Sequence, residues 1–399
     1  MSTTFADFSL SAPLLEALRE QHIEKPTPVQ AEAIPLIQSG RDVLVESPTG
    51  TGKTLAYLLP LLDRIDAESK EIQVLVLAPT HELVMQITTV AEGLLAKKNL
   101  TAQAIIGGVD VKRQLERLKK RPSLIAATPG RLVELLESRK LKVHQVKAIV
   151  VDEADRLLDD GFLRPVQEVM RRVMRDTQRL FFSATLPPDV IRLASSFVSD
   201  PAVVQASAPE NGLGVAHMYL VCEPRKKVDT LRRLLRMIHV QRSMVFVNQI
   251  DKVEEIVSKL EYHHLPCRLL HRDTSKEERA RSLQLFREGA VQVLITTDVA
   301  ARGIDIAEVE CVVHFDPAPD ADAYVHRSGR TGRMGRAGLV FSIITPQELF
   351  ILRKFSKQTG LVLTEKVMTH GQLLDPEAAR RKPAPAKRPV HKKRRFESK

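Results

Sequence analysis

The chain has 399 residues, of which 43% are apolar and 27% are charged, the proportions of an ordinary globular protein. This length predicts two or three domains, and the absence of an apolar run near ~20 residues argues against a membrane-spanning protein. The N-terminus lacks the basic-then-apolar order of a signal peptide. Of the formal charge of +11, the stretch from Pro376 to Lys399 holds +8, from ten lysines and arginines and two glutamates. The other 375 residues therefore carry only about +3.

Two further features of the composition narrow the class of protein. The cysteines Cys222, Cys267 and Cys311 lie far apart without metal-ligand spacing, so we expect reduced thiols in a cytoplasmic protein. Tryptophan is absent and aromatic residues make up 4% of the chain. A protein that grips nucleic acid by stacking bases would carry more aromatic rings. If this chain binds nucleic acid, we expect it to hold the backbone.

The N-terminal segment predicts a helix, a bend and a second helix. Leucines at helical spacing predict a helix within residues 8–22, with Ser11 as a candidate N-cap and Pro13 early in the first turn. Pro26 and Pro28 then fix an extended bend before a second predicted helix, over residues 30–38. Gln30 can both donate and accept hydrogen bonds, which suits the edge of an adenine ring. An ordinary helix-start glutamine would fit the same position.

A phosphate-binding loop follows the second helix. Residues 42–46 predict a buried strand, residues 47–54 read Ser-Pro-Thr-Gly-Thr-Gly-Lys-Thr, and an apolar helix follows. Glycines let successive backbone N–H groups point at one anion, and the new helix adds its own free N–H groups. Lys53 would reach the outer phosphates and Thr54 would hold Mg²⁺. The expected nucleotide contacts here are Ser47, Thr49, Gly50, Thr51, Gly52, Lys53 and Thr54.

Beyond the loop, apolar runs alternate with amphipathic segments, which predicts parallel sheets wrapped by helices. Strands are expected at 74–78, 102–106, 124–127, 148–151, 180–183 and 202–204, and helices at 83–97, 111–120 and 165–175. The alternation restarts with strands at 218–222, 244–247, 267–270, 293–296, 311–315 and 340–344, without a second phosphate loop. We expect a first domain over 1–206, a linker over 207–214, a second domain over 215–366 and a basic tail over 367–399. From about residue 376 the tail should be disordered.

Acidic residues end the predicted strand at 148–151. Carboxylates at that end of a parallel strand lie beside the phosphate loop in doubly wound folds. Asp152 would then complete the Mg²⁺ shell, and Glu153 would orient and deprotonate the attacking water. If these acidic residues are considered alone, they could instead be solvated residues that end the strand. Ser183 and Thr185, at the next strand end, would link Asp155 to the edge of the sheet.

A glycine-rich turn in the second unit carries three arginines. Residues 326–333 read His-Arg-Ser-Gly-Arg-Thr-Gly-Arg, and such arginines can meet an anion with two hydrogen bonds each. Because the first unit offers the triphosphate few cations beyond Lys53, an arginine from the second unit would complete the site. A basic loop that binds nucleic acid is the alternative.

These stretches together resemble the DEAD-box ATP-dependent RNA helicases of the compact bacterial kind. The family takes its name from the acid stretch that is Asp152-Glu153-Ala154-Asp155 here, and the resemblance covers about residues 5–365. It implies two RecA-like domains that bind ATP with Mg²⁺ and hold single-stranded RNA across both. The family usually has arginine where His81 stands, glycine where Arg272 stands and glutamine where Lys276 stands. These departures bear on RNA affinity rather than on ATP hydrolysis.

The resemblance also assigns roles residue by residue. Phe5 and Gln30 match the adenine contacts, and Asp305 matches the ribose contact. Catalytic roles fall on Lys53, Asp152, Glu153, Arg330 and Arg333, the last two as arginine fingers. The RNA-backbone contacts would be Pro79, Thr80, Gly107, Gly108, Thr128, Pro129, Arg131, Thr297, Arg302 and Gly303. The residues that couple hydrolysis to unwinding would be Asp155, Ser183, Thr185 and His326.

The expected function is local, non-processive unwinding of RNA duplexes or remodelling of RNA–protein particles, with little sequence preference. Ribosome assembly on ribosomal RNA is the expected setting, since a polycationic tail suits large structured RNA. We expect a cytoplasmic monomer that does not bind membranes. The alternatives are an ATP-gated RNA clamp or chaperone with little strand separation, a non-catalytic RNA-binding protein and a DNA helicase.

Overall fold

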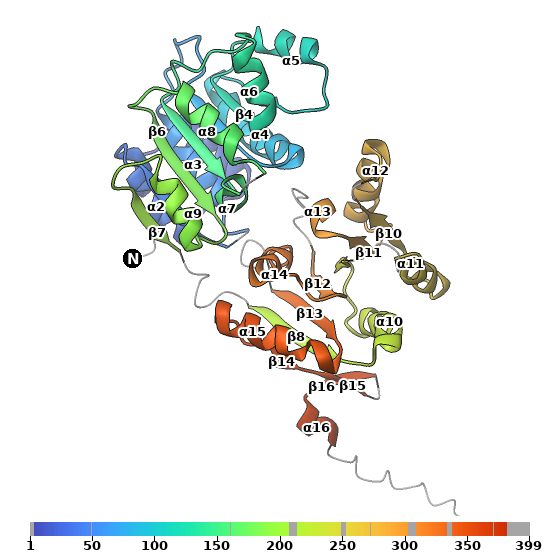
Figure 1. Cartoon of the computed structure of the whole chain (residues 1–399). Coiled ribbons are helices and arrows are strands. Elements are labelled where there is room, and N and C mark those ends of the chain that lie inside the picture. Colours follow the sequence, from blue (N-terminus) through green and yellow to red (C-terminus); the bar gives the residue numbers. More distant parts are fainter. Residues whose placement is uncertain are drawn as a thin grey trace, which may run out of the picture.

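The computed structural model describes residues 4–48, 50–159, 161–206, 214–248, 253–271, 273–301, 309–332, 337–369 and 371–380. Two seven-stranded parallel sheets dominate it, each flanked by helices on both faces (Figure 1). The predicted α/β class with two similar units is therefore confirmed. The expected linker lies outside the described residues from 207 to 213, as do Thr49, Arg302, Gly303, Asp305 and Arg333.

The first sheet has the strand order β3-β4-β2-β5-β6-β1-β7. Its strands are β1 (Val43–Glu46), β2 (Val74–Leu77), β3 (Ala102–Ile105), β4 (Leu124–Ala127), β5 (Ala148–Asp152), β6 (Gln178–Ser183) and β7 (Ala202–Gln205). The central strands are continuous aliphatic runs and are buried along their length, as expected for a sheet covered on both faces. The expected strands differ from these bounds by at most two residues, and the strand expected at 124–127 is identical to β4.

Helices cover both faces of the first sheet and form two apolar layers. They are η1 (Phe5–Phe8), α1 (Ala12–Glu20), α2 (Pro28–Gln38), α3 (Lys53–Asp63), α4 (His81–Leu95), η2 (Ala96–Lys98), α5 (Val111–Leu118), α6 (Pro129–Glu137), α7 (Ala154–Leu157), α8 (Leu163–Arg172) and α9 (Pro188–Ser195). The helix predicted within residues 8–22 is confirmed as α1, whose N-cap is Ser11 as predicted. Ser9 adopts a left-handed φ of 54°, which separates the short 3₁₀ turn η1 from α1.

The second sheet has the order β10-β11-β9-β12-β13-β8-β14, which is the order of the first sheet when each is counted from its own first strand. Its strands are β8 (Val215–Val221), β9 (Ser243–Phe246), β10 (Cys267–Leu270), β11 (Val293–Thr296), β12 (Cys311–His314), β13 (Gly338–Ile344) and β14 (Thr364–Glu365). The accompanying helices are η3 (Pro224–Lys226), α10 (Lys227–Met237), α11 (Val253–Tyr262), α12 (Lys276–Arg287), α13 (Asp298–Ala301), α14 (Ala321–Ser328), η6 (Pro346–Glu348) and α15 (Leu349–Thr359). None of the helices in the described part of the chain is long and apolar enough to cross a bilayer.

The expected basic tail begins with ordered structure. Strands β15 (Val367–Thr369) and β16 (Gln372–Leu374) pair as an antiparallel hairpin. Met368 and Leu373 of this hairpin pack against the core of the second unit. Disorder from about residue 376 is also wrong for the next five residues, which form α16 (Pro376–Arg380). Apolar residues in the hairpin explain the difference, because they give this stretch a core to pack on; residues 381–399 lie outside the described part.

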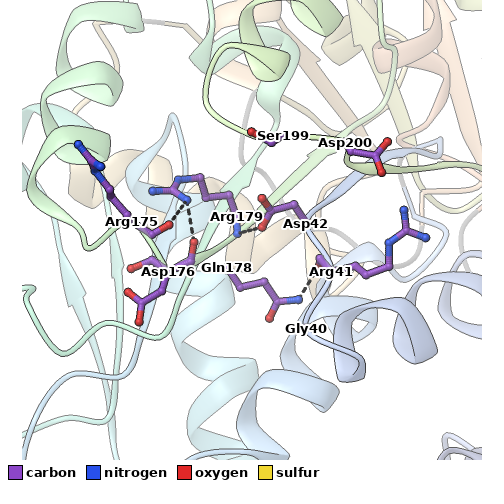
Figure 2. Close-up of a pocket in the computed structure, with 10 residues that line it drawn as sticks. Gly40, Arg41, Asp42, Arg175, Asp176, Gln178, Arg179, Ser199 and Asp200 are labelled. Carbon is purple, nitrogen blue, oxygen red and sulfur yellow. Dashed lines mark hydrogen bonds between the residues drawn. The ribbon is translucent and has the colours of Figure 1, made fainter.

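A pocket of about 350 Å³ opens at the amino ends of β1, β6 and β7 (Figure 2). Two of the charged side chains that line it, those of Arg179 and Asp42, are used by the fold itself. The Arg179 guanidinium donates to the backbone carbonyls of Met174, Arg175 and Thr177, at 2.9–3.1 Å, and the Arg179 backbone N–H donates to Asp42 at 2.7 Å. We therefore place the candidate site at the other end of the sheet, where the sequence motifs gather.

Candidate nucleotide and nucleic-acid sites

The carboxyl edge of the first sheet divides into two halves. Strands β5, β6 and β1 are neighbours, and the phosphate loop and the acid stretch follow their ends. Strands β3, β4 and β2 are neighbours on the other side, and the predicted RNA contacts of this unit follow their ends. The β2–β5 pairing joins the halves. One sheet thus presents a candidate nucleotide site beside a candidate nucleic-acid site.

The phosphate loop folds around the ammonium group of Lys53. Lys53 Nζ donates to the carbonyl oxygens of Ser47 at 2.5 Å and Pro48 at 3.4 Å. The hydroxyls of Ser47 and Thr51 lie 2.7 Å apart, and the Thr51 hydroxyl donates to the Pro48 carbonyl at 2.8 Å. α3 begins at Lys53 directly after Gly52. This places the lysine charge and a helix N-terminus at the same loop, the combination that suits a phosphate.

Gln30 fastens this loop to the start of α2. Its side-chain oxygen accepts from the Thr27 backbone N–H at 2.9 Å, and its nitrogen donates to the Gly52 carbonyl at 3.0 Å. Gly52 has φ +93°, in the left-handed region that favours glycine, and a Cβ there would displace the Gln30 amide nitrogen. The ring of Phe5 is only 4% exposed and packs edge-to-face on Phe8 with centroids 6.2 Å apart. The adenine roles of Gln30 and Phe5 thus stay predictions, since both side chains make contacts within the protein.

Asp152 ends β5 as a buried carboxylate with 4% exposure. One oxygen accepts from the Glu153 backbone N–H at 2.9 Å, and the other accepts from the Tyr57 hydroxyl at 2.9 Å. Burial raises the pKa of Asp152 to about 6, against the nearby charge of Lys53. Tyr57 lies on α3, three residues after Thr54, with its ring edge-to-face on Phe182. Sequence reasoning missed Tyr57, whose one signal was its place one helical turn after Thr54.

Glu153 follows in a strained backbone conformation. Its φ of 52° and ψ of 54° lie in the left-handed region, which costs a non-glycine residue on the order of 1 kcal/mol. The Arg156 guanidinium lies 3.6 Å from a Glu153 carboxylate oxygen and over the ring of Phe162. The pairing and the sharp turn fix the direction in which the chain leaves β5. Arg156 was also missed at the sequence level.

Asp155 connects three motifs. Its backbone N–H donates to the Ser183 hydroxyl at 3.2 Å, and the Ser183 carbonyl accepts from the Ser47 backbone N–H at 3.0 Å. Its carboxylate lies 3.2 Å from His326 Nε2 of the second unit. Burial acts to raise the pKa of Asp155, but hydrogen bonds from His326 and Ser183 outweigh it and lower that pKa. The Thr185 hydroxyl is buried without a partner among the described residues.

Comparison with known proteins decides the family. Residues 27–193 match the DEAD/DEAH box helicase family, and residues 226–335 match the helicase conserved C-terminal domain. The DEAD-box ATP-dependent RNA helicase CshC of Bacillus cereus is 43% identical, over 92% of this chain and 95% of its own. The chain belongs to the DEAD-box ATP-dependent RNA helicases. As its relatives do, this helicase hydrolyses ATP.

Other relatives of this helicase agree in sequence and fold. The probable ATP-dependent RNA helicase YfmL of Bacillus subtilis is 46% identical, over 88% of this chain and 93% of its own. The structure of yeast (S. cerevisiae) Dbp5 bound to RNA and ADP BeF3 is 31% identical and superposes with a TM-score of 0.81, over 91% of this chain and 95% of that one. The two sheets accordingly form the tandem RecA-like domains of the family.

In the second domain of the helicase, a buried arginine organises the glycine-rich turn. Arg327 is 1% exposed and lies on α14. Its guanidinium donates to both carboxylate oxygens of Asp298 at 2.6 and 2.7 Å and to the Asn248 side-chain oxygen at 2.7 Å. It also lies over the ring of Phe246, 5.2 Å from the centroid. This network fixes the C-terminal end of α14, which carries His326 and leads into the partly exposed Arg330.

The predicted RNA contacts of the helicase lie where β2, β3 and β4 end. The Ala127 carbonyl accepts from the Ala78 backbone N–H, and the Ile105 carbonyl accepts from Thr128, each at 3.0 Å. These bonds bring Pro79-Thr80, Gly107-Gly108 and Thr128-Pro129 to one edge. If Gly107 carried a Cβ, that atom would lie 3.4 Å from His81 Nε2. The histidine side chain therefore lies directly over this glycine.

Two of the predicted RNA contacts also have structural roles. Thr80 caps α4 by accepting from the Leu83 backbone N–H at 3.2 Å. Arg131 pairs with Glu134 at 3.2 Å and its side chain is 11% exposed, so little of it faces solvent. In the second domain Thr297 is partly exposed and its carbonyl accepts from the Thr296 hydroxyl. Their RNA contacts remain predictions.

Proposed function

We propose that this helicase couples ATP hydrolysis on its first domain to the binding of single-stranded RNA across both domains. Coupling of this kind opens short duplexes locally rather than by long translocation. The adjacency of the two halves of the first sheet carries the proposal, since strands β2 and β5 put the two sites side by side. The Asp155–His326 contact adds a path to the second domain.

The donors near the phosphate loop fit Mg²⁺ bound together with ATP. Mg²⁺ takes oxygen ligands, and it uses one or two protein groups besides waters and phosphate oxygens. Thr54 and Asp152 offer a hydroxyl and a carboxylate, and the Tyr57 hydroxyl interacts with both. When bound, the ion would neutralise charge on the phosphates. Asp152 and Thr54 would hold it at the loop.

The remaining roles in hydrolysis follow from charge and position. Lys53 would shift from the loop carbonyls onto the outer phosphates, and Glu153 would orient and deprotonate the attacking water. Arg330 and Arg333 would approach from the second domain and stabilise the developing charge as arginine fingers. Closure of the two domains would therefore complete the site.

The RNA contacts we propose are to the backbone. Helix starts, glycine loops and threonine hydroxyls suit phosphate oxygens, and such contacts carry little sequence information. Discrimination of RNA from DNA would depend on 2′-hydroxyl groups. We further propose a cytoplasmic monomer that acts on ribosomal RNA or pre-ribosomal particles, where the basic C-terminal residues would add affinity.

Two variants test the proposal. Lys53→Ala should abolish ATP hydrolysis, whereas Glu153→Gln should keep ATP binding and accumulate the closed complex, so that ATP raises its RNA affinity at least tenfold. Fluorescence anisotropy with labelled RNA, with and without ATP–Mg²⁺, measures this. RNA affinity of Glu153→Gln that ATP leaves unchanged would refute the coupling. ATP-dependent affinity without separation of a short duplex would favour the clamp over the unwinding enzyme.

A further inference from the structure

The outward face of α5 concentrates positive charge that the sites described above do not use. Residues 112–121 hold six lysines and arginines and one acid, Glu116. These ten residues therefore carry +5, whereas all 375 residues before Pro376 together carry about +3. Outside this segment the body of the chain is thus slightly acidic. Solvated helix faces ordinarily mix both signs, and this face does so at one position only.

The fold presents these charges to solvent. Val111, Leu115 and Leu118 pack inward against the first domain's core. The opposite face of α5 carries the exposed side chains of Lys112, Arg113 and Arg117, and the exposed Lys119, Lys120 and Arg121 follow directly after the helix. Glu116 pairs with Lys119 at 2.7 Å in a strongly exposed contact, which contributes little stability. The stability of α5 therefore does not account for the other cations.

Hydrogen bonds hold this face beside the Gly107-Gly108 loop. The Gln114 side-chain nitrogen donates to the Ile106 carbonyl at 2.7 Å, and Gln103 on the edge strand β3 donates to the Gln114 carbonyl at 3.0 Å. Asp110 caps the helix by accepting from the Lys112 backbone N–H at 2.6 Å. α5 lies at the outer edge of the first domain, beyond β4 and α6 (Figure 1). The cationic face is therefore held next to Gly107-Gly108, at the outer end of the row of predicted RNA contacts that follow β2, β4 and β3.

We propose that the outward face of α5 binds the phosphate backbone of RNA that flanks the segment held at Gly107-Gly108. The inference rests on the proposed function, because it takes Gly107-Gly108 as an RNA contact. Exposed lysines and arginines without an aromatic side chain suit phosphates, bind without regard to sequence and respond strongly to salt. An acidic protein segment would meet the same charge. The position of this face next to the Gly107-Gly108 loop, a predicted RNA contact, favours RNA over an acidic protein segment.

A triple substitution and a matched control test the proposal. The variant combines Lys112→Gln, Arg113→Gln and Arg117→Gln. The control removes the same charge from α15 of the second domain, by Arg353→Gln, Lys354→Gln and Lys357→Gln, at three exposed positions. Anisotropy with oligouridine of about 8 and about 20 nucleotides, between about 50 and 200 mM salt, gives affinities in the presence of a non-hydrolysable ATP analogue. ATP turnover without RNA checks that each protein is folded.

The α5 variant should bind the 20-mer roughly tenfold more weakly at about 100 mM salt, with a salt slope smaller by about two. Its affinity for the 8-mer and its basal turnover should match the unmodified protein, and the α15 control should bind both RNAs normally. A charge-keeping variant, Arg113→Lys with Arg117→Lys, should retain affinity for the 20-mer.

Four results would overturn the proposal. An unchanged 20-mer affinity in the α5 variant refutes it while leaving the proposed function intact, because the unmodified protein still binds RNA. An equal loss in the α15 control assigns the effect to net charge. Polyglutamate serves as a probe for acidic protein segments. If the α5 variant loses binding to polyglutamate but binds RNA as the unmodified protein does, the face is assigned to an acidic protein partner. Absence of RNA binding by the unmodified protein refutes the proposed function as well.

Discussion

The carboxylate of Asp155 lies 3.2 Å from Nε2 of His326. Asp155 is in the acid stretch that follows β5, and His326 is on α14 of the second domain, one residue before the buried Arg327. Asp155 is also bonded to the first sheet, because its backbone N–H donates to the Ser183 hydroxyl at the end of β6. A change at the nucleotide site can therefore reach the arginine-bearing turn through directly bonded groups.

His326→Ala should uncouple the domains without blocking ATP. We expect ATP affinity within about twofold of the original and stimulation of turnover by RNA roughly tenfold lower, since coupling energies between sites are typically about 1–3 kcal/mol. Steady-state turnover at a range of RNA concentrations measures the effect. Asp155→Asn alone and the double variant complete a mutant cycle. Effects that simply add would argue against a direct contribution of this pair.

Tyr57→Phe should disturb the predicted Mg²⁺ site while keeping the ring in place. The substitution leaves one buried oxygen of Asp152 without its 2.9 Å donor, a loss that costs about 1–3 kcal/mol. We expect the Mg²⁺ concentration for half-maximal turnover to rise several-fold, with a matching loss in Mg²⁺-dependent binding of a fluorescent ADP. Tyr219→Phe is the control, because it removes a hydroxyl that contacts Glu365 far from the loop. Identical Mg²⁺ titrations for Tyr57→Phe and the original protein would refute this role.

Sequence reasoning located the strands well because each is a continuous apolar run in a sheet buried on both faces. The strand order required the structure, since adjacency of β2 and β5 depends on packing between distant segments. Tyr57 was missed for the same reason, as its partner Asp152 lies 95 residues away. Helix α6 was missed although its buried Leu132, Leu135 and Leu136 have helical spacing, and the β15–β16 hairpin was hidden by the basic composition that follows it.

Acid should destabilise the second domain first. Burial lowers the pKa of His217 to about 4, and its ring contacts the Tyr324 hydroxyl at 3.0 Å. Since the unfolded chain takes up the proton near the ordinary pKa of about 6.5, this contribution is fully present above about pH 6.5 and is lost as pH falls from 6.5 toward 4. The loss should reach about 3 kcal/mol near pH 4.

Urea unfolding of the full chain at several pH values measures this dependence. His217→Gln should flatten it between pH 6.5 and 4, although the buried His314, whose pKa is also lowered, will keep part of it. His144→Gln, at an exposed position of the first domain, should leave the curve unchanged. A curve that His217→Gln does not alter would exclude this histidine as the cause.

Truncation after Arg380 should distinguish the contribution of the basic C-terminal residues to RNA binding from any contribution to the fold. Residues 381–399 contain nine lysines and arginines and one glutamate, and the truncated chain keeps the β15–β16 hairpin and α16. We expect unchanged ATP turnover without RNA, and weaker RNA binding that is most evident at low salt, where charges are least screened. A fall in RNA-independent turnover would instead mean that these residues support the fold.

The most direct test of the account is ATP turnover by the purified protein, measured at modest salt with no nucleic acid, with RNA and with DNA of the same length. The account predicts low basal turnover, strong stimulation by RNA and little by DNA, because the nucleotide and RNA sites share one sheet and the Asp155–His326 pair connects that sheet to the second domain. Turnover that is equally rapid under all three conditions would contradict the coupling.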